Sequence, residues 1–205
     1  MDLQPRAIPL TSSLIKPASA VLTRAFSEDP FFTYVLPQTV QRDRSVGWLF
    51  ERLLKYGLTY GKVFTTPALE GVAMWLGPYR IDLELAGIIQ SGLFRLPFKM
   101  GWEAFRRSMA LTQTANHIHH KLIIDPHWYL YELGVDPSHR REGVGSTLLQ
   151  PILAQADRER LACYLETNNE VNLPFYERNG FRLSDRGQAT SDSPFTWSML
   201  RKPGV

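Results

Sequence analysis

The chain of 205 residues has a single cysteine, Cys163, so it cannot form a framework of internal disulfides. Cys163 falls in an apolar stretch, which predicts a buried structural thiol and a reducing, cytoplasmic setting. The N-terminal region lacks the apolar core of a signal peptide, because Lys16, Pro17 and Arg24 interrupt it. Since no apolar run approaches the length of a membrane span, we expect no insertion in a membrane.

An excess of charge of one sign is also nearly absent. The sequence holds 23 Lys and Arg against 20 Asp and Glu, which gives a formal net charge of +3. This balance argues against a nucleic-acid partner but is compatible with a site for a polyanionic cofactor. Hydrophobic residues make up 44% of the chain, and we find no internal repeat. We therefore expect one globular domain over residues 1–205.

The most informative stretch runs from a predicted strand at 128–135 into a helix that begins near Ser146 and ends near Arg160. The loop between them carries Gly143 and Gly145. The first N–H groups of a helix have no partner inside it and carry the positive end of the helix dipole, and glycines let an anion approach the main chain. The stretch therefore predicts a site for an anion. The alternative is a glycine turn that starts the helix and binds nothing.

The spacing within this loop narrows the choice of anion. The loop lacks the Lys-Ser/Thr ending of a nucleoside-triphosphate P-loop, and it is not the G-x-G-x-x-G of a dinucleotide fold. It reads Arg140-x-x-Gly143-x-Gly145. This pattern resembles the pyrophosphate loop of the GNAT superfamily of acetyl-CoA-dependent N-acyltransferases.

A second block resembles the same superfamily. After a predicted strand at 162–167, Asn169, Tyr176 and the pair Gly180-Phe181 keep the register of the superfamily's next helix. Three longer runs are similar to the branch that contains puromycin N-acetyltransferase. These runs are 133–139, 165–178 and 196–204. The resemblance is close from about residue 128 onward, so it supports the cofactor half better than the acceptor half.

The resemblance implies an α/β (α+β) fold, with a mixed, mostly antiparallel central sheet flanked by helices and acetyl-CoA beside the fourth strand. Residue patterns outside the two motifs fit such a fold. They predict a short edge strand at 6–10, a helix to about residue 27, a short helix or turn at 31–37 and a helix at 40–60. They also predict a strand pair at 62–66 and 71–76, a helical segment at 81–121 broken at Gly92 and Pro97, a loop at 185–193 and a last strand at 195–200.

The resemblance also assigns residues to the cofactor. The backbone that would hold the pyrophosphate, with charge added by the two arginines, comprises Arg140, Arg141, Gly143, Val144, Gly145 and Ser146. In the superfamily the positions of Arg141 and Glu142 often carry Gly and a basic residue. Glu142 is therefore a departure that would weaken cofactor binding.

The thioester and the pantetheine arm would be held by the fourth strand and the helix after the fifth. By resemblance, main-chain N–H groups from Leu133 to Val135 polarise the thioester carbonyl, with Val135 as the leading candidate. Asn169 and Asn172 would hydrogen-bond the pantetheine arm. Asn169 equally fits an N-cap, because an asparagine just before a helix often caps it.

The resemblance makes Tyr176 the general acid that protonates the departing thiolate. The alternative for Tyr176 is packing beneath the strand. Glu132 is a candidate general base, directly or through water, although a structural salt bridge fits it equally well. Glu28 and Asp29, at a predicted helix break, are candidates to bind a cationic acceptor.

Two further groups of residues have less specific patterns. His117, His119 and His120 lie close together, but their spacing fits no zinc site, so we expect solvated side chains and no metal. The bulky apolar residues of 93–109 fit core packing best, with an acceptor pocket or a dimer surface as alternatives.

We therefore expect an N-acetyltransferase that uses acetyl-CoA as co-substrate. The primary amine of a small molecule or peptide would attack the thioester directly in a ternary complex, without a covalent Cys163 intermediate. Two alternatives stay open: a CoA-binding sensor without catalysis, and an enzyme that acetylates protein N-termini or lysines. A homodimer is possible.

Overall fold

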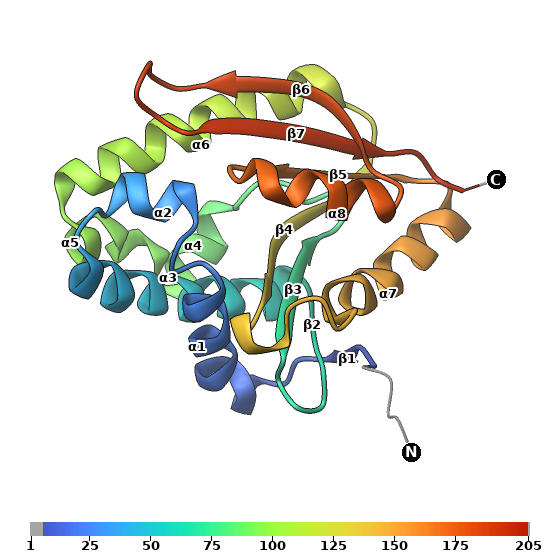
Figure 1. Ribbon diagram of the computed structural model, residues 1–205, viewed down its shortest axis with the longest axis horizontal. Helices are drawn as coiled ribbons and strands as arrows, with labels where there is room; N and C mark the ends of the chain where they lie inside the picture. The colour runs from blue at the N-terminus through green and yellow to red at the C-terminus, as the bar shows by residue number, and fades with distance from the viewer. Residues whose placement is uncertain (1–5, 205) are drawn as a thin grey trace.

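The computed structural model describes residues 6–204 and has a seven-stranded sheet at its centre (Figure 1). The strands are β1 (Ile8–Pro9), β2 (Gly61–Thr65), β3 (Gly71–Leu76), β4 (His127–Val135), β5 (Ala162–Thr167), β6 (Arg182–Gln188) and β7 (Phe195–Arg201). Their order is β1-β2-β3-β4-β5-β7-β6. Strands β4 and β5 run parallel, and the other neighbouring pairs are antiparallel, which confirms the expected mixed sheet.

Helices cover both faces of this sheet (Figure 1). The α-helices are α1 (Ile15–Ala25), α2 (Pro30–Val35), α3 (Thr39–Tyr60), α4 (Leu85–Ser91), α5 (Leu96–Met100), α6 (Trp102–Leu122), α7 (Val144–Glu159) and α8 (Leu173–Arg178). The 3-10 helices are η1 (Ser12–Leu14), η2 (Leu93–Arg95), η3 (Pro137–His139) and η4 (Glu170–Asn172). None of the helices within residues 6–204 has both the length and the apolar run that crossing a bilayer requires.

Two apolar clusters, one on each face, hold the layers together. On one face, side chains of α1 to α6 pack against β2 and β3, with Phe50 and Met74 fully buried. On the other face, α7 and α8 pack against β3, β4 and β5 around Trp75, Leu148 and Leu165. Burial of this apolar surface on both faces is the main favourable term for the fold.

Two of the expected element boundaries were wrong. Within 81–121 the chain breaks at Gly92 as expected, but the second break is Gly101, with φ of +86°, and not Pro97. Pro97 lies in the first turn of α5, where its missing N–H costs no helix hydrogen bond. Residues 185–188 belong to β6 rather than to a loop, because this polar strand pairs with β7 along one edge while its side chains stay largely exposed.

Candidate active site

Strands β4 and β5 separate part-way along their length, and this separation makes the site. Their pairing covers His127–Leu130 on β4 and Ala162–Leu165 on β5. Beyond Leu130, β4 continues to Val135 beside β3 but is not paired with β5. Figure 1 shows β5 turned away from β4 on this side. The free edge at Tyr131–Val135, which includes Leu133, therefore offers backbone groups that a ligand can pair with.

A bulge in β4 decides which way the side chains at this opening point. Met74 pairs with Glu132 and Trp75 with Leu130, so Tyr131 is an extra residue opposite β3. Tyr131 packs with the cluster of α1 to α6. Two residues after Glu132, a Cβ on Gly134 would meet Leu22 of α1 at 2.7 Å, so this side of β4 also faces α1. Because alternate residues share a face, Glu132 points toward α1 and α2.

Asp29 approaches Glu132 from the link between α1 and α2. Its Oδ1 accepts a hydrogen bond from the Phe31 N–H at 2.9 Å and so caps α2. Burial raises the pKa of Glu132 to about 8, and the negative charge of Asp29 adds to this. Burial also raises the pKa of Asp29 to about 6, against the hydrogen bond from Phe31. No basic side chain within residues 6–204 is close enough to lower either pKa, so this acid pair lacks a countercharge.

Tyr176 reaches the same point from α8, on the opposite face of the sheet. Its ring is 7% exposed and makes edge contacts with Phe175 and Phe181, at centroid distances of 5.1 Å and 6.0 Å. Burial raises the pKa of Tyr176 above its ordinary value, and the charges of Asp29 and Glu132 raise it further. The opening thus brings a protonated phenol into electrostatic reach of two carboxylates.

The glycine loop leads into α7 as expected, and its two glycines serve different purposes. Gly143 has φ of +82° with open space around it, a conformation that glycine adopts without strain. Gly145 is buried in the first turn of α7, where a Cβ would meet the Phe175 ring at 3.0 Å. Gly145 therefore lets α8, which carries Tyr176, pack closely on the start of α7, next to buried Val144.

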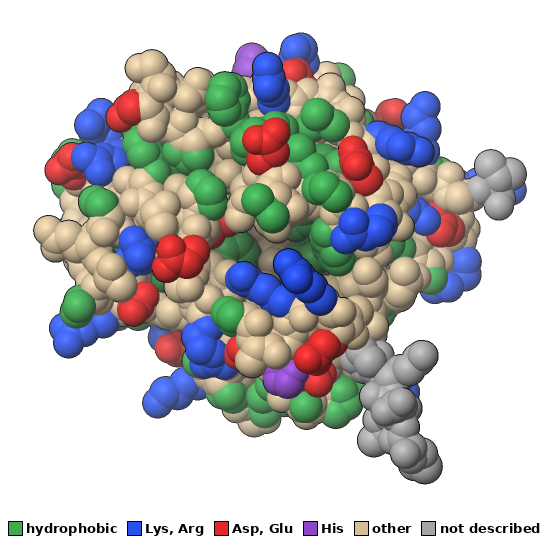
Figure 2. Space-filling view, in the orientation of Figure 1, with side chains coloured by type: hydrophobic (Ala, Val, Ile, Leu, Met, Phe, Trp, Pro, Cys, Tyr) green, Lys and Arg blue, Asp and Glu red, His purple; other side chains and the backbone are tan. Residues whose placement is uncertain are grey.

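Two side-chain contacts fix this loop. Arg140 donates from Nη2 to the carbonyl oxygen of Ala25 at 3.0 Å, which ties the loop to the end of α1. Asn179, just after α8, donates to Ser146 Oγ at 3.2 Å. Arg141 is exposed, with φ of +68°. Figure 2 shows Lys and Arg side chains beside a hollow near the centre of this face.

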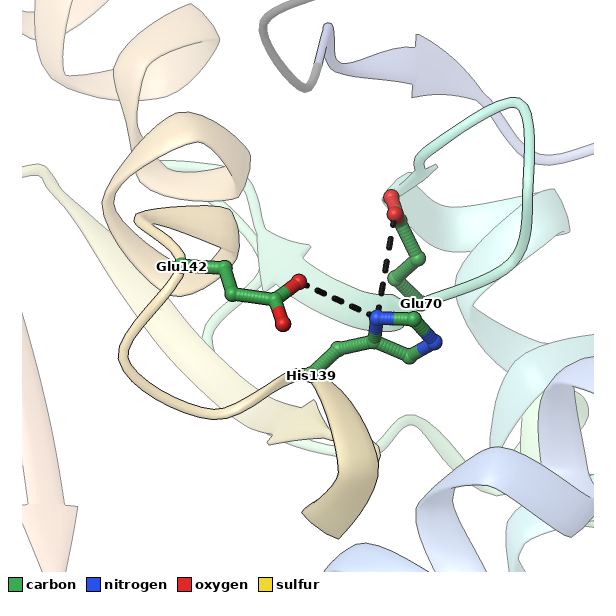
Figure 3. A group of neighbouring side chains, drawn as sticks. All are labelled: Glu70, His139 and Glu142. Atoms are coloured by element: carbon green, nitrogen blue, oxygen red, sulfur yellow. Dashed lines mark hydrogen bonds and ion pairs between the residues drawn. The ribbon is translucent and has the colours of Figure 1, made fainter.

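Glu142, the acidic departure in the loop, is paired with a neighbouring histidine (Figure 3). His139 Nδ1 lies 3.1 Å from Glu142 Oε2 and 4.0 Å from Glu70 Oε1. One possible ligand atom from each of these side chains lies within 4.8 Å of the others. The His139 imidazole therefore contacts both carboxylates, and the side chain of Glu142 is 54% exposed.

The two asparagines of the predicted pantetheine contact are engaged locally. Asn169 Oδ1 accepts a hydrogen bond from the Val171 N–H at 3.2 Å, so Asn169 caps η4, which was the alternative role. Asn172 Nδ2 donates to Thr167 Oγ1 at 3.4 Å. Their contact with a pantetheine arm stays a prediction.

The expectation of solvated histidines was wrong for His119. This side chain is 2% exposed, stacks on Tyr164 at 3.8 Å and hydrogen-bonds His127 at 2.7 Å between the two Nε2 atoms. The sequence held a signal that we missed, because His119 continues the buried helical face of α6. That face comprises Ala104, Ser108, Leu111 and Ile118. His117 and His120 are exposed, as expected.

The apolar segment 93–109 divides between core and surface. Leu93 and Met100 are buried in the cluster of α1 to α6, as core packing predicts. Phe94, Phe98 and Trp102 are 50%, 87% and 72% exposed. The expectation of core packing was therefore wrong for these three, and they lie outside the opening between β4 and β5.

Comparison with known proteins relates this geometry to one family. The model of the Acetyltransferase (GNAT) family matches residues 110–181. An uncharacterized N-acetyltransferase of Schizosaccharomyces pombe is 29% identical over 185 residues, which is 87% of this chain and 74% of the relative. The structure of histone acetyltransferase HPA2 and related acetyltransferase from Corynebacterium glutamicum is 26% identical, with a TM-score of 0.68 over 99% of this chain and 98% of that one. PaiA N-acetyltransferase from Thermoplasma acidophilum, in complex with coenzyme A, matches in fold, with 14% identity and a TM-score of 0.56 over 98% and 99% of the two chains.

Proposed function

Because this chain is an acyltransferase enzyme that belongs to the GNAT superfamily of N-acetyltransferases, we propose that it transfers an acetyl group from acetyl-CoA to a primary amine. The acceptor would be a small molecule or a peptide. The amine would attack the thioester directly, with both substrates bound at once. Residues 1–205 would act as one catalytic domain, and the branch that contains puromycin N-acetyltransferase is the one we favour.

The observation that carries this proposal is the meeting of Asp29, Glu132 and Tyr176 where β4 and β5 separate. The two carboxylates come from one face of the sheet and the phenol from the other. Acyl transfer to an amine needs a group that takes a proton from the ammonium and a group that gives one to the thiolate. A buried acid pair without a countercharge suits the cationic acceptor, and a protonated tyrosine suits the leaving sulfur.

The cofactor would lie in the opening, between the start of α7 and the free edge of β4. The backbone of Gly143, Val144, Gly145 and Ser146 would receive the pyrophosphate, with charge from Arg140 and Arg141. The pantetheine would pair with the free edge of β4 near Asn169 and Asn172. The coenzyme A complex of the Thermoplasma acidophilum relative supports the use of this cofactor by the fold.

In the reaction we propose, Glu132 takes one proton from the acceptor ammonium while the charge of Asp29 holds the ammonium in place. The free amine then attacks the thioester carbon, and the main-chain N–H of Val135 or Leu133 stabilises the oxyanion. When the C–S bond breaks, Tyr176 protonates the thiolate. The nitrogen of the intermediate loses its second proton, which restores the Tyr176 hydroxyl and leaves the neutral amide.

The test is a comparison of Tyr176→Phe with the wild type. We expect acetyl-CoA affinity, measured by calorimetry, to stay the same, while release of the coenzyme A thiol with an amine panel falls by about 10²–10⁴ in kcat. Tyr79→Phe is the matched control, since Tyr79 is 82% exposed and follows the end of β3 far from the opening. Binding without thiol release by the wild type would favour the CoA-binding sensor, and equal turnover in Tyr176→Phe would overturn the role of Tyr176.

We also propose that the chain forms a homodimer. The exposed apolar side chains of Phe94, Phe98 and Trp102 are spaced four residues apart along η2, α5 and the start of α6. A surface of this kind is uncommon on a monomer. Sedimentation of the wild type and of Phe98→Ser would test it, and a monomer at all concentrations would overturn it.

A further inference from the structure

Glu166 is a buried carboxylate at the opening that the proposed reaction does not use. It directly follows Leu165, the last residue of β5 that pairs with β4. Its side chain is 10% exposed. Oε2 accepts a hydrogen bond from the Tyr129 hydroxyl at 2.6 Å, whereas Oε1 is buried and has no hydrogen-bond partner within residues 6–204. A buried carboxylate oxygen without a partner is costly, so this atom marks a place where a donor is missing.

His119 lies close to this oxygen but does not supply a positive charge. Its Nδ1 is 3.8 Å from Glu166 Oε1. The short contact of 2.7 Å between His127 Nδ1 and the carbonyl oxygen of Asp125 requires a proton on that nitrogen, because a carbonyl only accepts. Neutral His127 then accepts at Nε2 from the Nε2–H of His119, which leaves His119 with a lone pair at Nδ1. Burial, with smaller contributions from His127 and His120, lowers the pKa of His119 to about 3, so its ring stays neutral.

Two tyrosine rings connect Glu166 to the proposed acceptor site. Tyr129, which donates to Glu166, contacts Tyr131 edge to face at 5.4 Å between ring centroids. The bulge turns both Tyr131 and Glu132 toward α1 and α2. The charges of Glu132 and Glu166 both add to the effect of burial in raising the pKa of Tyr131 above its ordinary value. One face of the sheet therefore carries a carboxylate, two aromatic rings and a second carboxylate in that order.

We propose that Glu166 binds a second cationic group of the acceptor, so that the preferred acceptors are diamines or longer polyamines. One amine would meet Glu132 and Asp29 and receive the acetyl group, while the other would donate to Oε1 of Glu166. The methylene chain between them would lie over Tyr131 and Tyr129, whose rings favour nearby cations. This inference rests on the proposed function, because it adds a contact to the same acceptor site.

An ammonium group supplies the hydrogen-bond donor and the positive charge that Glu166 lacks. An ammonium carries three donors and a positive charge, so it would satisfy Oε1 and neutralise the carboxylate at once. No Lys or Arg within residues 6–204 lies close enough to lower the pKa of Glu166, which burial raises to about 7. A neutral alkyl group at the same place would leave the carboxylate unpaired.

The experiment compares kcat/KM for 1,4-diaminobutane, butylamine and 4-amino-1-butanol, using coenzyme A thiol release. We expect the wild type to prefer the diamine over both others by roughly ten- to hundredfold, the worth of a hydrogen bond to a charged group. In Glu166→Gln the ratio of diamine to butylamine should fall to near one. Diamines of three and five carbons would show which distance between the two amines fits best. The readout is the ratio of kcat/KM for the diamine to kcat/KM for butylamine, not either value alone.

Three outcomes would overturn the proposal. Equal kcat/KM for diamine and butylamine in the wild type would show that no second cation site exists, while the acetyltransferase assignment would stand. A diamine preference that persists in Glu166→Gln would place the second site elsewhere. Acetylation of no amine at all by a wild type that binds acetyl-CoA would instead overturn the proposed function. If Glu166→Gln does not fold, Tyr129→Phe, which removes the donor to Oε2, should reduce the ratio, and an unchanged ratio there would also count against the proposal.

Discussion

Oε2 of Glu142 lies 3.1 Å from Nδ1 of His139, and this contact directs the acidic side chain of the glycine loop toward Glu70 and the β2–β3 hairpin (Figure 3). The same carboxylate, if released, would be free to approach the start of α7, where the phosphates of acetyl-CoA are expected. His139 therefore makes an acid tolerable at a position where the superfamily often has a basic residue.

Replacement of His139 by Ala should weaken acetyl-CoA binding by about two- to fivefold, because Glu142 would then repel the phosphates from an exposed position. Calorimetry at low ionic strength measures the change. The double variant His139→Ala, Glu142→Gln should regain the wild-type affinity. An equal loss in the single and double variants would mean that His139 contacts the cofactor itself.

The raised pKa of Glu132 predicts a pH dependence of turnover. A base with a pKa of about 8 is mostly protonated at neutral pH, so kcat/KM should rise as pH increases toward 8 and level off above it. In Asp29→Asn the loss of a neighbouring negative charge should lower the pKa of Glu132 and move this rise to lower pH. The asparagine keeps an oxygen that can cap α2. If kcat/KM rose over the same pH range in both Asp29→Asn and Glu132→Gln, a group other than Glu132 would be responsible for the pH dependence.

The same carboxylate predicts a pH dependence of stability with a definite sign. Glu132 holds its proton more tightly in the folded chain, where its pKa is about 8, than at the ordinary value of 4.5. Between these values the folded state binds more protons, so the free energy of unfolding falls as pH rises. Glu132→Gln should therefore stabilise the protein without ligands at pH 8, by on the order of 1–3 kcal/mol, and much less at pH 5. Urea unfolding at the two pH values checks this, and a larger gain at pH 5 would contradict it.

Cys163 should have no part in turnover. It is fully buried in β5, and burial raises the pKa of its thiol to about 12, so the thiolate needed for attack does not form at neutral pH. In Cys163→Ala, kcat should stay within about twofold, while the free energy of unfolding should fall by about 1–2 kcal/mol because a small cavity opens. A thousandfold loss of kcat in a folded variant would establish a covalent role.

Local sequence patterns were sufficient for most elements and for the position of the glycine loop. The loop before α7, the helix with Tyr176 and the limits of β5 all depend on residues close together in the chain. Gly134 is a different case. Its missing Cβ makes room for Leu22 and Ala25 of α1. Such a contact joins segments more than a hundred residues apart, and no local pattern reports it.

The direction of the Glu132 side chain could not be predicted from the sequence either. Strict alternation along β4 would place Glu132 on the same face as Leu130, toward α7. The extra residue at Tyr131 reverses this and turns Glu132 toward Asp29. Glu166 was missed for a related reason, because its partners Tyr129 and His119 come from β4 and α6. Bulges and buried polar networks depend on tertiary pairing, which residue spacing in one segment does not specify.

The contact between Gly145 and Phe175 predicts a coupling between the glycine loop and Tyr176, the proposed acid. A Cβ at Gly145 would meet the Phe175 ring at 3.0 Å, and Phe175 precedes Tyr176 on α8. Gly145→Ala should therefore displace α8 slightly and lower kcat by about tenfold or more, because misplacement of a catalytic group by an ångström is costly. Assays of thiol release measure the loss of kcat, and calorimetry with acetyl-CoA measures any loss of affinity for the cofactor.

The control for this prediction is Gly143→Ala, in the same loop. Its Cβ would have open space, but φ of +82° strains any residue with a side chain, so the loop backbone should suffer instead. We expect Gly143→Ala to weaken acetyl-CoA binding more than it lowers kcat, and Gly145→Ala to do the reverse. If Gly145→Ala lowered only the affinity for acetyl-CoA, the packing of Phe175 would not position Tyr176.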